Sequence, residues 1–320
     1  MGSSSHRQAV VAGGAGFIGS HLCDLLIRKG LQVICVDNLI TGSRQNIAGL
    51  FGRPGFRFLN LDISRDIIPE SSVDYIFHFA SPASPLDYQN YPEETALANS
   101  LGTLRLLQLA RATGARFLLA STSEAYGDPL QSPQAETYWG NVNSFGPRSC
   151  YDESKRFAET LSYIYLHKYD LDIRIIRIFN TYGPRMRASD GRVVSNFINQ
   201  ALTGAPLTVY GRGSQTRSLC YISDLVAGVD RAMFTPGLRG EIFNLGNPEE
   251  TAVLDLAKKI KGLTGSESPL VFKPPLPDDP HQRRPDISKA RRLLHWQPQI
   301  PAAVGLPRTI AHYRNLAKSR

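Results

Sequence analysis

The sequence is poor in cysteine and has no long apolar run, and both shortages exclude classes of protein. The four cysteines in 320 residues are far apart, so they indicate neither a disulfide framework nor a zinc-binding spacing. No apolar stretch approaches the roughly 20 residues of a membrane-spanning helix. The segment 1–7 is polar and lacks the apolar core of a signal peptide. We therefore expect a cytoplasmic protein with no metal, no membrane contact and reduced thiols at Cys23, Cys35, Cys150 and Cys220.

Charged residues are also sparse, at 20% of the chain, although their balance is basic, with a formal net charge of +8. A basic surplus is one feature of nucleic-acid-binding proteins. Here, however, the arginines are scattered, and no stripe of basic and aromatic residues or helix-turn-helix pattern accompanies them. We therefore expect no nucleic-acid partner, because a phosphate ligand needs only a few of these arginines. The apolar content of 42% is typical of a globular protein with an ample core.

Three glycines at three-residue spacing are the most informative feature that the sequence does have. Gly13, Gly16 and Gly19 follow an apolar run at 8–12 and precede an amphipathic segment, which predicts a strand, a tight turn and a helix. Gly13 permits the turn, Gly16 lets the backbone approach a pyrophosphate, and Gly19 allows the helix to pack closely. Phosphates would meet the N–H groups at the helix start, so the pattern predicts a bound dinucleotide.

A carboxylate farther along the chain indicates which dinucleotide binds. A second apolar strand is predicted at 31–36 and leads into Asp37, about 20 residues beyond the glycine turn. A carboxylate at this place accepts hydrogen bonds from the adenosine ribose and repels a 2′-phosphate, so Asp37 favours NAD over NADP. The alternative for Asp37 is a residue that starts a turn before Asn38.

Strand patterns alternate with helical patterns over the first 180 residues, and this predicts an α/β fold. We expect a Rossmann-type doubly wound parallel sheet with a smaller α/β substrate-binding domain. The dinucleotide-binding domain is predicted over 1–182, with 218–238 returning to it, and the substrate-binding domain over 183–320. The predicted strands are 8–12, 31–36, 56–60, 74–79, 116–121, 173–178 and 207–210, and the predicted helices are 17–30, 93–113, 152–169, 192–204, 221–235 and 252–263.

Tyr151 and Lys155 are spaced to share one face of a helix. An ammonium beside a phenol stabilises the phenolate, which would lower the pKa of Tyr151 from about 10 toward neutrality. Such a group can remove a proton from an alcohol while a hydride leaves for nicotinamide. The segment 120–124, at the end of a predicted strand, offers hydroxyl groups that could share the substrate oxygen with Tyr151. The alternative is a solvated pair on a helix face.

These features together resemble the extended short-chain dehydrogenase/reductase family, whose members modify nucleotide-sugars. Within that family, four strings resemble those of UDP-glucuronate decarboxylases, also called UDP-xylose synthases, and the resemblance runs from about residue 8 to 312. It implies NAD as cofactor, UDP-glucuronate as substrate and a homodimer formed through the helices at 93–113 and 152–169. The four strings are His78–Pro85, Ser121–Pro129, Gly146–Arg156 and Gly191–Phe197.

The resemblance implies a redox cycle within one site. NAD takes a hydride from C4 of UDP-glucuronate while Tyr151 accepts the hydroxyl proton, and the 4-ketone lets carbon dioxide leave as an enolate forms. Thr122 and Tyr151 would stabilise the enolate oxygen, C5 is protonated, and NADH returns the hydride to give UDP-xylose. Lys155, Glu124 and Arg283 complete the implied catalytic set, with Glu124 or its bound water in proton transfer.

The resemblance also implies two sets of binding residues. The cofactor set is Gly13, Gly16, Phe17, Ile18, Asp37, Asn38, Thr41, Gly42, Asp62, Ile63, Phe79, Ser81, Ala120, Tyr151, Lys155, Thr181 and Arg192. The substrate set is Pro82, Asn180, Val194, Ser195, Asn196, Phe197, Tyr210, Arg217 and Arg283.

Structural alternatives stay open for several of these residues. Glu124 could be a strand-end acid that faces solvent, and Arg283 part of a solvated basic loop. Asp62 could form an Asx turn. Asn180 could close a strand-end turn, and Tyr210 could fill the core.

Departures from the decarboxylase pattern leave the exact sugar open. Leu97 stands where related enzymes have a lysine, Ser154 where a glycine is usual, and 187–189 is unusual. The first alternative is a UDP-glucuronate 4-epimerase, which Glu124 argues against because such epimerases carry a small residue there. A second is a decarboxylase that releases the UDP-4-keto-pentose and NADH. A third is a non-catalytic NAD-sensing or scaffolding protein, which the Thr122, Tyr151 and Lys155 set argues against.

Overall fold

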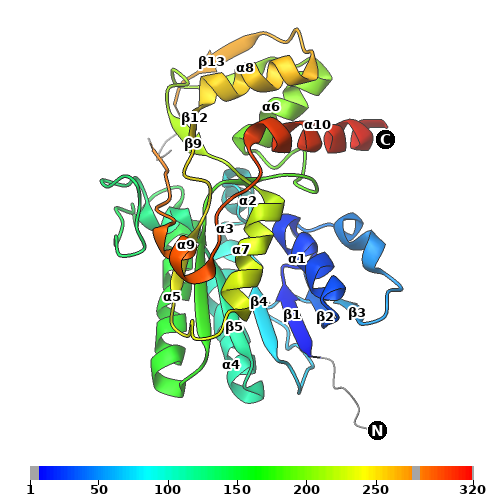
Figure 1. Ribbon diagram of the computed structural model, residues 1–320, viewed down its shortest axis with the longest axis vertical. Helices are drawn as coiled ribbons and strands as arrows, with labels where there is room; N and C mark the ends of the chain where they lie inside the picture. The colour runs from blue at the N-terminus through cyan, green and yellow to red at the C-terminus, as the bar shows by residue number, and fades with distance from the viewer. Residues whose placement is uncertain (1–6, 276–281, 319–320) are drawn as a thin grey trace.

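The computed structural model describes residues 7–275 and 282–318. A twisted sheet with helices on both faces makes up the lower part of the molecule in Figure 1, and a smaller group of elements lies above it. The sheet contains β1 (Gln8–Ala12), β2 (Gln32–Val36), β3 (Phe56–Leu59), β4 (Tyr75–His78), β5 (Arg116–Thr122), β6 (Ile173–Ile178) and β11 (Ile242–Leu245). Their order is β11-β6-β5-β4-β1-β2-β3, and each neighbouring pair is parallel. The predicted doubly wound parallel sheet is confirmed.

Helices bury both faces of this sheet. α1 (Phe17–Arg28) and α7 (Ile222–Phe234) cover one face, and α4 (Thr103–Thr113) and α5 (Ser149–Tyr169) cover the other. A strand covered on both sides is apolar at successive positions, because alternate side chains enter opposite cores. Val10 and Val11 belong to the two different cores, and both are fully buried. This explains the continuous apolar runs in the sequence.

The strand order reverses beside β1, and this reversal creates the binding edge. Ala12 pairs with Val36 on one side and with His78 on the other. The residues that follow these three strand ends, Gly13, Asp37 and Phe79, therefore meet at one edge. Parallel sheets of this kind bind ligands in the crevice at such a reversal.

The long helix predicted at 93–113 is interrupted in the structure. It consists of α3 (Pro92–Leu97), a π-helical turn η2 (Ala98–Gly102) and then α4. The turn directs Asn99 inward, where its amide donates to Ser81 Oγ at 3.1 Å and Ser154 Oγ at 3.0 Å. Wide turns inside helices often occur at functional sites, and this one connects α5 with the segment after β4.

The smaller upper part is built around two parallel strands and three helices. β8 (Leu207–Tyr210) pairs with β13 (Leu270–Lys273), and α6 (Val193–Thr203), α8 (Val253–Thr264) and α10 (Ala302–Lys318) lie beside them. The remaining elements are η1 (Arg44–Leu50), α2 (Pro85–Asn90), η3 (Ser123–Tyr126), β7 (Thr181–Tyr182), β9 (Thr216–Ser218), β10 (Cys220–Tyr221), β12 (Glu250–Ala252) and α9 (Ser288–Leu294).

The chain returns to the sheet for longer than the predicted 218–238. Besides α7, it contributes β11 as the edge strand, and α9 packs beside β11. The sequence patterns missed the strands β11 and β13, the short strands β7, β9, β10 and β12, and the helices α2, α9 and α10. The boundary at residue 182 itself stays a prediction.

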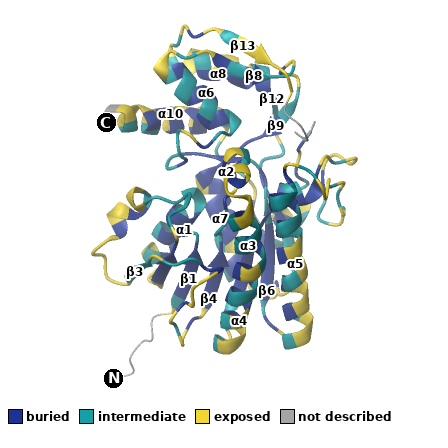
Figure 2. Ribbon diagram, turned by 180° about the vertical axis from the view of Figure 1, so that it is seen from behind, coloured by how far each residue is buried: buried dark blue, intermediate teal, exposed yellow. Residues whose placement is uncertain are grey.

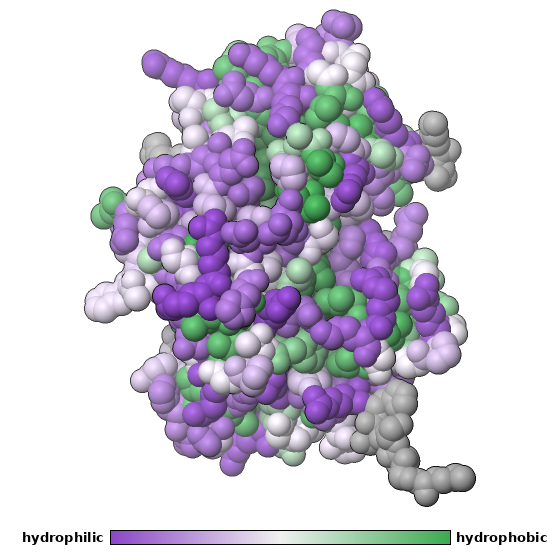
Figure 3. All heavy atoms as spheres, viewed as in Figure 1, coloured by the Kyte–Doolittle hydropathy of each residue, from purple (hydrophilic) through white to green (hydrophobic). Residues whose placement is uncertain are grey.

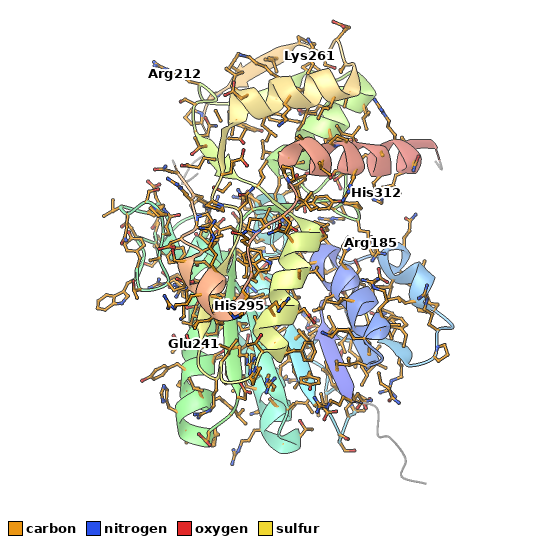
Figure 4. All side chains as sticks on the ribbon, viewed as in Figure 1. Arg185, Arg212, Glu241, Lys261, His295 and His312 are labelled. Atoms are coloured by element: carbon orange, nitrogen blue, oxygen red, sulfur yellow. The ribbon has the colours of Figure 1, made fainter. Side chains whose placement is uncertain are left out.

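A short segment after β7 ties the upper part to the sheet. The backbone N–H of Arg185 donates to His312 Nε2 on α10 at 3.0 Å, and the Arg185 guanidinium lies 2.7 Å from Asp24 on α1. Figure 4 shows Arg185 and His312 at this junction. Hydrophilic side chains cover most of the face seen in Figure 3. Within 7–275 and 282–318, no helix combines the length and apolar character needed to cross a bilayer.

Candidate active site

The turn between β1 and α1 is shaped by close backbone contacts. Gly13 has a φ of +78°, and a Cβ on it would lie 2.6 Å from backbone atoms of Phe79 and Ala80. A Cβ on Gly19 would lie 2.1 Å from the Gly13 carbonyl oxygen. No side chain caps the start of α1 at Gly16. The turn therefore excludes side chains and leaves the first N–H groups of α1 for a ligand.

Asp37 holds this turn from the side. Its carboxyl accepts hydrogen bonds from Ala15 N at 3.0 Å and from Leu39 N at 2.8 Å. The second bond is an Asx-type turn, so the alternative for Asp37 is also present in the structure. Asp62 likewise accepts from Ser64 N at 2.8 Å. A cavity at this edge is lined by Gly13, Gly16, Asp37, Asn38, Thr41, Asp62, Ile63, Phe79, Ser81 and Pro82 from the predicted sets.

A larger cavity lies between the carboxyl edge of the sheet and the upper part. From the predicted sets it is lined by Ile18, Phe79, Ser81, Ala120, Thr122, Glu124, Tyr151, Lys155, Asn180, Thr181, Arg192, Val194, Asn196, Phe197, Tyr210, Arg217 and Arg283. These residues come from distant parts of the sequence, so the fold assembles most of the predicted site. Tyr210 is half-buried in this lining and does not fill the core.

A few predicted residues lie elsewhere. Ser195 is fully buried and donates to the Arg192 carbonyl at 2.8 Å, so its side chain is outside the cavity lining. Phe17 packs edge-on against His21. Gly42 lies against the Asp37 carboxyl, where a Cβ would come within 2.6 Å of Oδ1. Pro82 lines the cavity at the glycine turn and is absent from the lining of the larger cavity.

Tyr151, Lys155 and Thr122 meet at the floor of the larger cavity. All three are buried, and Lys155 Nζ lies 5.9 Å from the centre of the Tyr151 ring and donates to the Ala120 carbonyl at 2.9 Å. Burial raises the pKa of Tyr151 to about 12, although a hydrogen bond with Thr122 acts in the opposite direction. Burial lowers the pKa of Lys155 to about 7. In this structure the pKa of Tyr151 is therefore raised, whereas its proximity to Lys155 predicted a lowered one.

Glu124 lies at the centre of a buried charge cluster. Arg283 binds its carboxyl through both terminal nitrogens, and Arg148 Nη2 lies 2.6 Å from Oε2. The Glu124 side chain is only 12% exposed, and Arg283 is buried as well. The alternatives of a solvent-facing acid and a solvated basic loop are therefore wrong. Burial raises the pKa of Glu124, but the two guanidiniums outweigh it and hold that pKa below its usual value.

Three residues of this cluster were not singled out by sequence reasoning. Arg148 precedes α5 and connects Glu124 with Asp152, whose Oδ2 lies 3.8 Å from Arg148 Nε. Tyr88 on α2 stacks on Tyr151, with ring centres 5.2 Å apart and planes at 9°. The guanidinium of Arg148 lies 5.9 Å from the centre of the Tyr88 ring. Arg148 and Asp152 are four residues apart, so the i,i+4 spacing of a helix could have indicated their pairing. The stacking of Tyr88 on Tyr151 depends on the fold and has no such signal in the sequence.

The departures noted in the sequence have local structural roles. Ser154 Oγ donates to the Cys150 carbonyl at 2.5 Å and accepts from Asn99. Arg187 pairs with Asp87 on α2 at 2.5 Å, which fastens the segment after β7 beside the larger cavity. Leu97 ends α3 and does not line either cavity.

The sequence was compared with protein-family models and with curated proteins. The family described as "NAD dependent epimerase/dehydratase family" matches residues 9–246. The chain belongs to this family. It is 52% identical over 306 residues to UDP-glucuronic acid decarboxylase 1 of Arabidopsis thaliana, with 96% of this chain and 69% of the relative covered. It is 49% identical over 313 residues to UDP-glucuronic acid decarboxylase 1 of Danio rerio, covering 98% and 74%.

Solved structures of the epimerase/dehydratase family share this fold. UDP-glucuronic acid 4-epimerase from Bacillus cereus, in complex with UDP-glucuronic acid and NAD, is 29% identical with a TM-score of 0.88, covering 97% of this chain and 99% of that one. UDP-glucose 4-epimerase from Thermotoga maritima, with UDP-glucose, is 30% identical with a TM-score of 0.87 and the same coverage. The resemblance to the extended short-chain dehydrogenase/reductases is thus confirmed.

Proposed function

We propose that this family member is an NAD-dependent UDP-glucuronate decarboxylase, which converts UDP-glucuronate to UDP-xylose and carbon dioxide. The observation that carries the proposal is the placement of Arg283, Arg148 and Glu124 beside Tyr151 in one buried cavity. Two guanidiniums face one carboxylate there, so the cluster can attract a second carboxylate, that of a uronic acid. Relatives about 50% identical over nearly the whole chain carry the name decarboxylase.

The residues at the glycine turn fit NAD. The turn is a cradle that a Cβ would fill, and the start of α1 has no side-chain cap. A carboxylate, Asp37, stands at the end of β2, where a ribose hydroxyl would bind and a 2′-phosphate would be repelled. When bound, NAD would supply a hydride acceptor and, once reduced, a hydride donor.

Gly13→Ala tests this fit. The added Cβ would collide with the backbone of Phe79 and Ala80, and the left-handed conformation alone costs about 1 to 2 kcal/mol. We expect the Kd for NAD to rise at least about tenfold by isothermal titration calorimetry. Gly30→Ala is the matched control, because its φ is +79° but no atom of the described residues lies within 4 Å of the added Cβ. Equal changes in Kd for both variants would contradict the cradle.

The chain's own residues account for the oxidation of C4. Tyr151 is placed to accept the C4 hydroxyl proton, and Thr122, in hydrogen-bond contact with it, is placed to share that oxygen. Both can then donate to the oxygen of the enolate that forms as carbon dioxide leaves. Lys155 donates to the Ala120 carbonyl, and this hydrogen bond fixes its amino group behind the phenol.

The product distinguishes the proposal from its rivals. After incubation with UDP-glucuronate and NAD, we expect a nucleotide-sugar lighter by one carbon dioxide, with no net NADH, by mass spectrometry and absorbance. Unchanged mass with inverted C4 would instead favour the 4-epimerase. This alternative is tested because the Bacillus cereus 4-epimerase has the same fold. Carbon dioxide with stoichiometric free NADH would favour release of the UDP-4-keto-pentose. No conversion of UDP-glucuronate would favour the non-catalytic alternative.

We also propose a homodimer formed through α4 and α5, as the resemblance implied. Figure 2 shows exposed residues along the outer faces of these helices. Phe157 and Ile164 on α5 are 48% and 42% exposed and lie two turns apart, on one face. A second copy would cover this apolar stripe across a twofold axis. The cytoplasmic location stays a prediction.

Charge in this stripe should disrupt the dimer. We expect the chain to sediment as a dimer in velocity ultracentrifugation, and the double variant Phe157→Glu, Ile164→Glu to sediment as a monomer with unchanged circular dichroism. Ile67→Glu is the control, because Ile67 is 83% exposed but lies outside both helices. A monomeric unmodified chain, or a double variant that stays dimeric, would contradict this interface.

A further inference from the structure

Three successive residues at the end of β5 each form a hydrogen bond with a residue of α5. The three residues of α5 are spaced by four, so they share one face of the helix. The pairs are Ala120 with Lys155 at 2.9 Å, Ser121 with Glu159 at 2.6 Å, and Thr122 with Tyr151. The first and third pairs belong to the proposed catalytic set. The pair of Ser121 and Glu159 has no role in that set, although it lies between the other two on β5.

Arg177 on β6 holds Glu159 in place. Its Nε donates to Glu159 Oε1 at 2.9 Å and its Nη2 donates to Oε2 at 2.7 Å, so the ion pair is bidentate. Its Nη1 donates to the Tyr126 hydroxyl at 3.0 Å and to the Glu136 carbonyl at 3.1 Å. The side chains of Arg177 and Glu159 are only 11% and 14% exposed. Because all three nitrogens of this guanidinium are engaged, the carboxylate that it binds is fixed as well.

The register of the sheet places Arg177 beside Ser121. The two residues are paired in the parallel ladder between β5 and β6, and both side chains reach Glu159 on α5. The earlier side chains on this face of the two strands are apolar and belong to one core, namely Phe117, Leu119, Ile173 and Ile175. The polar group of Ser121, Glu159 and Arg177 therefore begins where the apolar core ends, at the level of the proposed catalytic residues.

Glu159 and Arg177 reach the reaction only through other residues. The lining of the larger cavity includes Ser121 but, within 7–275 and 282–318, neither Glu159 nor Arg177. Ser121 is 3% exposed, and its hydroxyl is directed to Glu159 by their hydrogen bond. Any effect of the ion pair on the reaction must therefore pass through the end of β5 or through the neighbouring residues of α5.

We propose that Glu159, anchored by Arg177, is a positioning residue that holds Ser121 and thereby fixes the end of β5 against the catalytic face of α5. A displaced Ser121 would displace Ala120 and Thr122, whose contacts with α5 belong to the proposed catalytic set. A misplacement of about 1 Å can cost on the order of 100-fold in rate. This role rests on the proposed function, because it concerns the geometry of that reaction.

Glu159 also acts on the charge of Lys155. Burial lowers the pKa of Lys155 to about 7, and the carboxylate of Glu159, one turn farther along α5, acts in the opposite direction. The other titratable or charged groups that face Lys155 are Tyr151 from α5, His78 from β4 and, behind Glu159, Arg177 from β6. Burial lowers the pKa of His78 to about 3, so this ring stays neutral. Loss of the Glu159 charge should therefore favour the neutral amine of Lys155.

Single-turnover release of carbon dioxide by the NAD-loaded protein measures the proposed role. For Glu159→Gln and for Ser121→Ala we expect the rate at saturating UDP-glucuronate to fall about tenfold. The Kd for NAD and the Kd for UDP should stay within about twofold by calorimetry, because the glycine turn is unchanged. The double variant should lose much less than the product of the two single losses, since both changes act through one contact.

Asp172→Asn is the matched control for stability. Asp172 forms ion pairs at the opposite end of the same two strands, 2.5 Å from Arg116 on β5 and 3.1 Å from Arg174 on β6. We expect Asp172→Asn to lower the urea midpoint of unfolding, as Glu159→Gln does, and yet to keep the full rate. A merely structural role of Glu159 would make the two variants alike in both measurements.

A titration of the free protein gives a readout without substrate or NAD. In protein labelled with carbon-13 in lysine, the Cε signal of Lys155 is identified by its loss in Lys155→Met. Its midpoint should fall by about half a pH unit or more in Glu159→Gln, because the carboxylate that favours the ammonium is gone. The midpoint should not change in Asp172→Asn or Ser121→Ala, which keep Glu159.

The outcomes separate this proposal from the proposed function. A full rate in Glu159→Gln, an equal loss of rate in Asp172→Asn, or a double variant with the full product of the single losses would overturn it. If Glu159→Gln does not fold, the rate of Ser121→Ala against that of Asp172→Asn decides. If the unmodified protein releases no carbon dioxide, the proposed function fails. The titration then decides whether Glu159 acts on Lys155, and an unchanged midpoint in Glu159→Gln would contradict it.

Discussion

Tyr151→Phe is expected to lower the rate of carbon dioxide release on the order of 10³-fold, because we expect Tyr151, among the described residues of the cavity, to accept the C4 hydroxyl proton. The aromatic ring and its stacking on Tyr88 remain, so the fold should not change. Stopped-flow absorbance should show no NADH after mixing with UDP-glucuronate. Calorimetry should give a Kd for NAD within about threefold of the unmodified value, since only a hydroxyl is lost.

An exposed tyrosine on the same helix is the control for this variant. Tyr163 is 64% exposed on α5, and Tyr163→Phe should keep the full rate. NADH formation by Tyr151→Phe at the unmodified rate would contradict the assignment of the base. Loss of NAD binding together with activity would instead indicate a defect in the cofactor site, which the calorimetry detects.

Glu124→Gln is expected to reduce the free energy of unfolding by about 3 kcal/mol, because two buried guanidiniums lose the carboxylate that neutralises them. The rate of carbon dioxide release should fall on the order of 100-fold as Arg283 loses its position. Urea unfolding of the NAD-saturated protein measures the first effect. The pKa of Glu124 is held below its usual value, so its contribution to stability is present at neutral pH and is lost as pH falls through that lowered pKa.

A partly exposed ion pair on α5 is the matched control. Glu153 lies 3.6 Å from Arg156, and both side chains are 39% exposed. Glu153→Gln should therefore cost less than about 1 kcal/mol. If both variants lose the same stability, then the cluster around Glu124 is no stronger than a surface pair, and the account of Arg283 as a residue fixed by Glu124 is wrong.

The parts of the fold that follow local rules could be predicted from the sequence. The glycine turn, the strands at 8–12 and 173–178 and the shared face of Tyr151 and Lys155 depend on spacing alone, and the structure has them at those places. β11 was missed because it is four residues long and carries Asn244, a fully buried amide that donates to the Gln134 carbonyl at 2.9 Å. A short run that contains a polar residue lacks the apolar pattern of a strand, and its pairing partner is distant in the sequence.

Contacts across the fold explain the other differences. α10 contains Pro307, which breaks a helical pattern but is tolerated here. At the π-helical turn η2, the Asn99 amide donates hydrogen bonds to Ser81 and Ser154, which are distant from it in the sequence. Tyr88 and Arg148 acquire their roles only when α2 and the start of α5 meet at η3. The pKa of Tyr151 follows burial, which spacing within one helix does not reveal.

UDP-glucuronate labelled with carbon-13 at C6 tests the central claim most directly. In one NMR tube with the protein and NAD, we predict that the carboxylate signal disappears and labelled carbon dioxide and bicarbonate appear. An unlabelled UDP-xylose should form in equal amount, without lasting NADH. A label that stays on the sugar while C4 inverts, or that is never released, would contradict the decarboxylation on which this account depends.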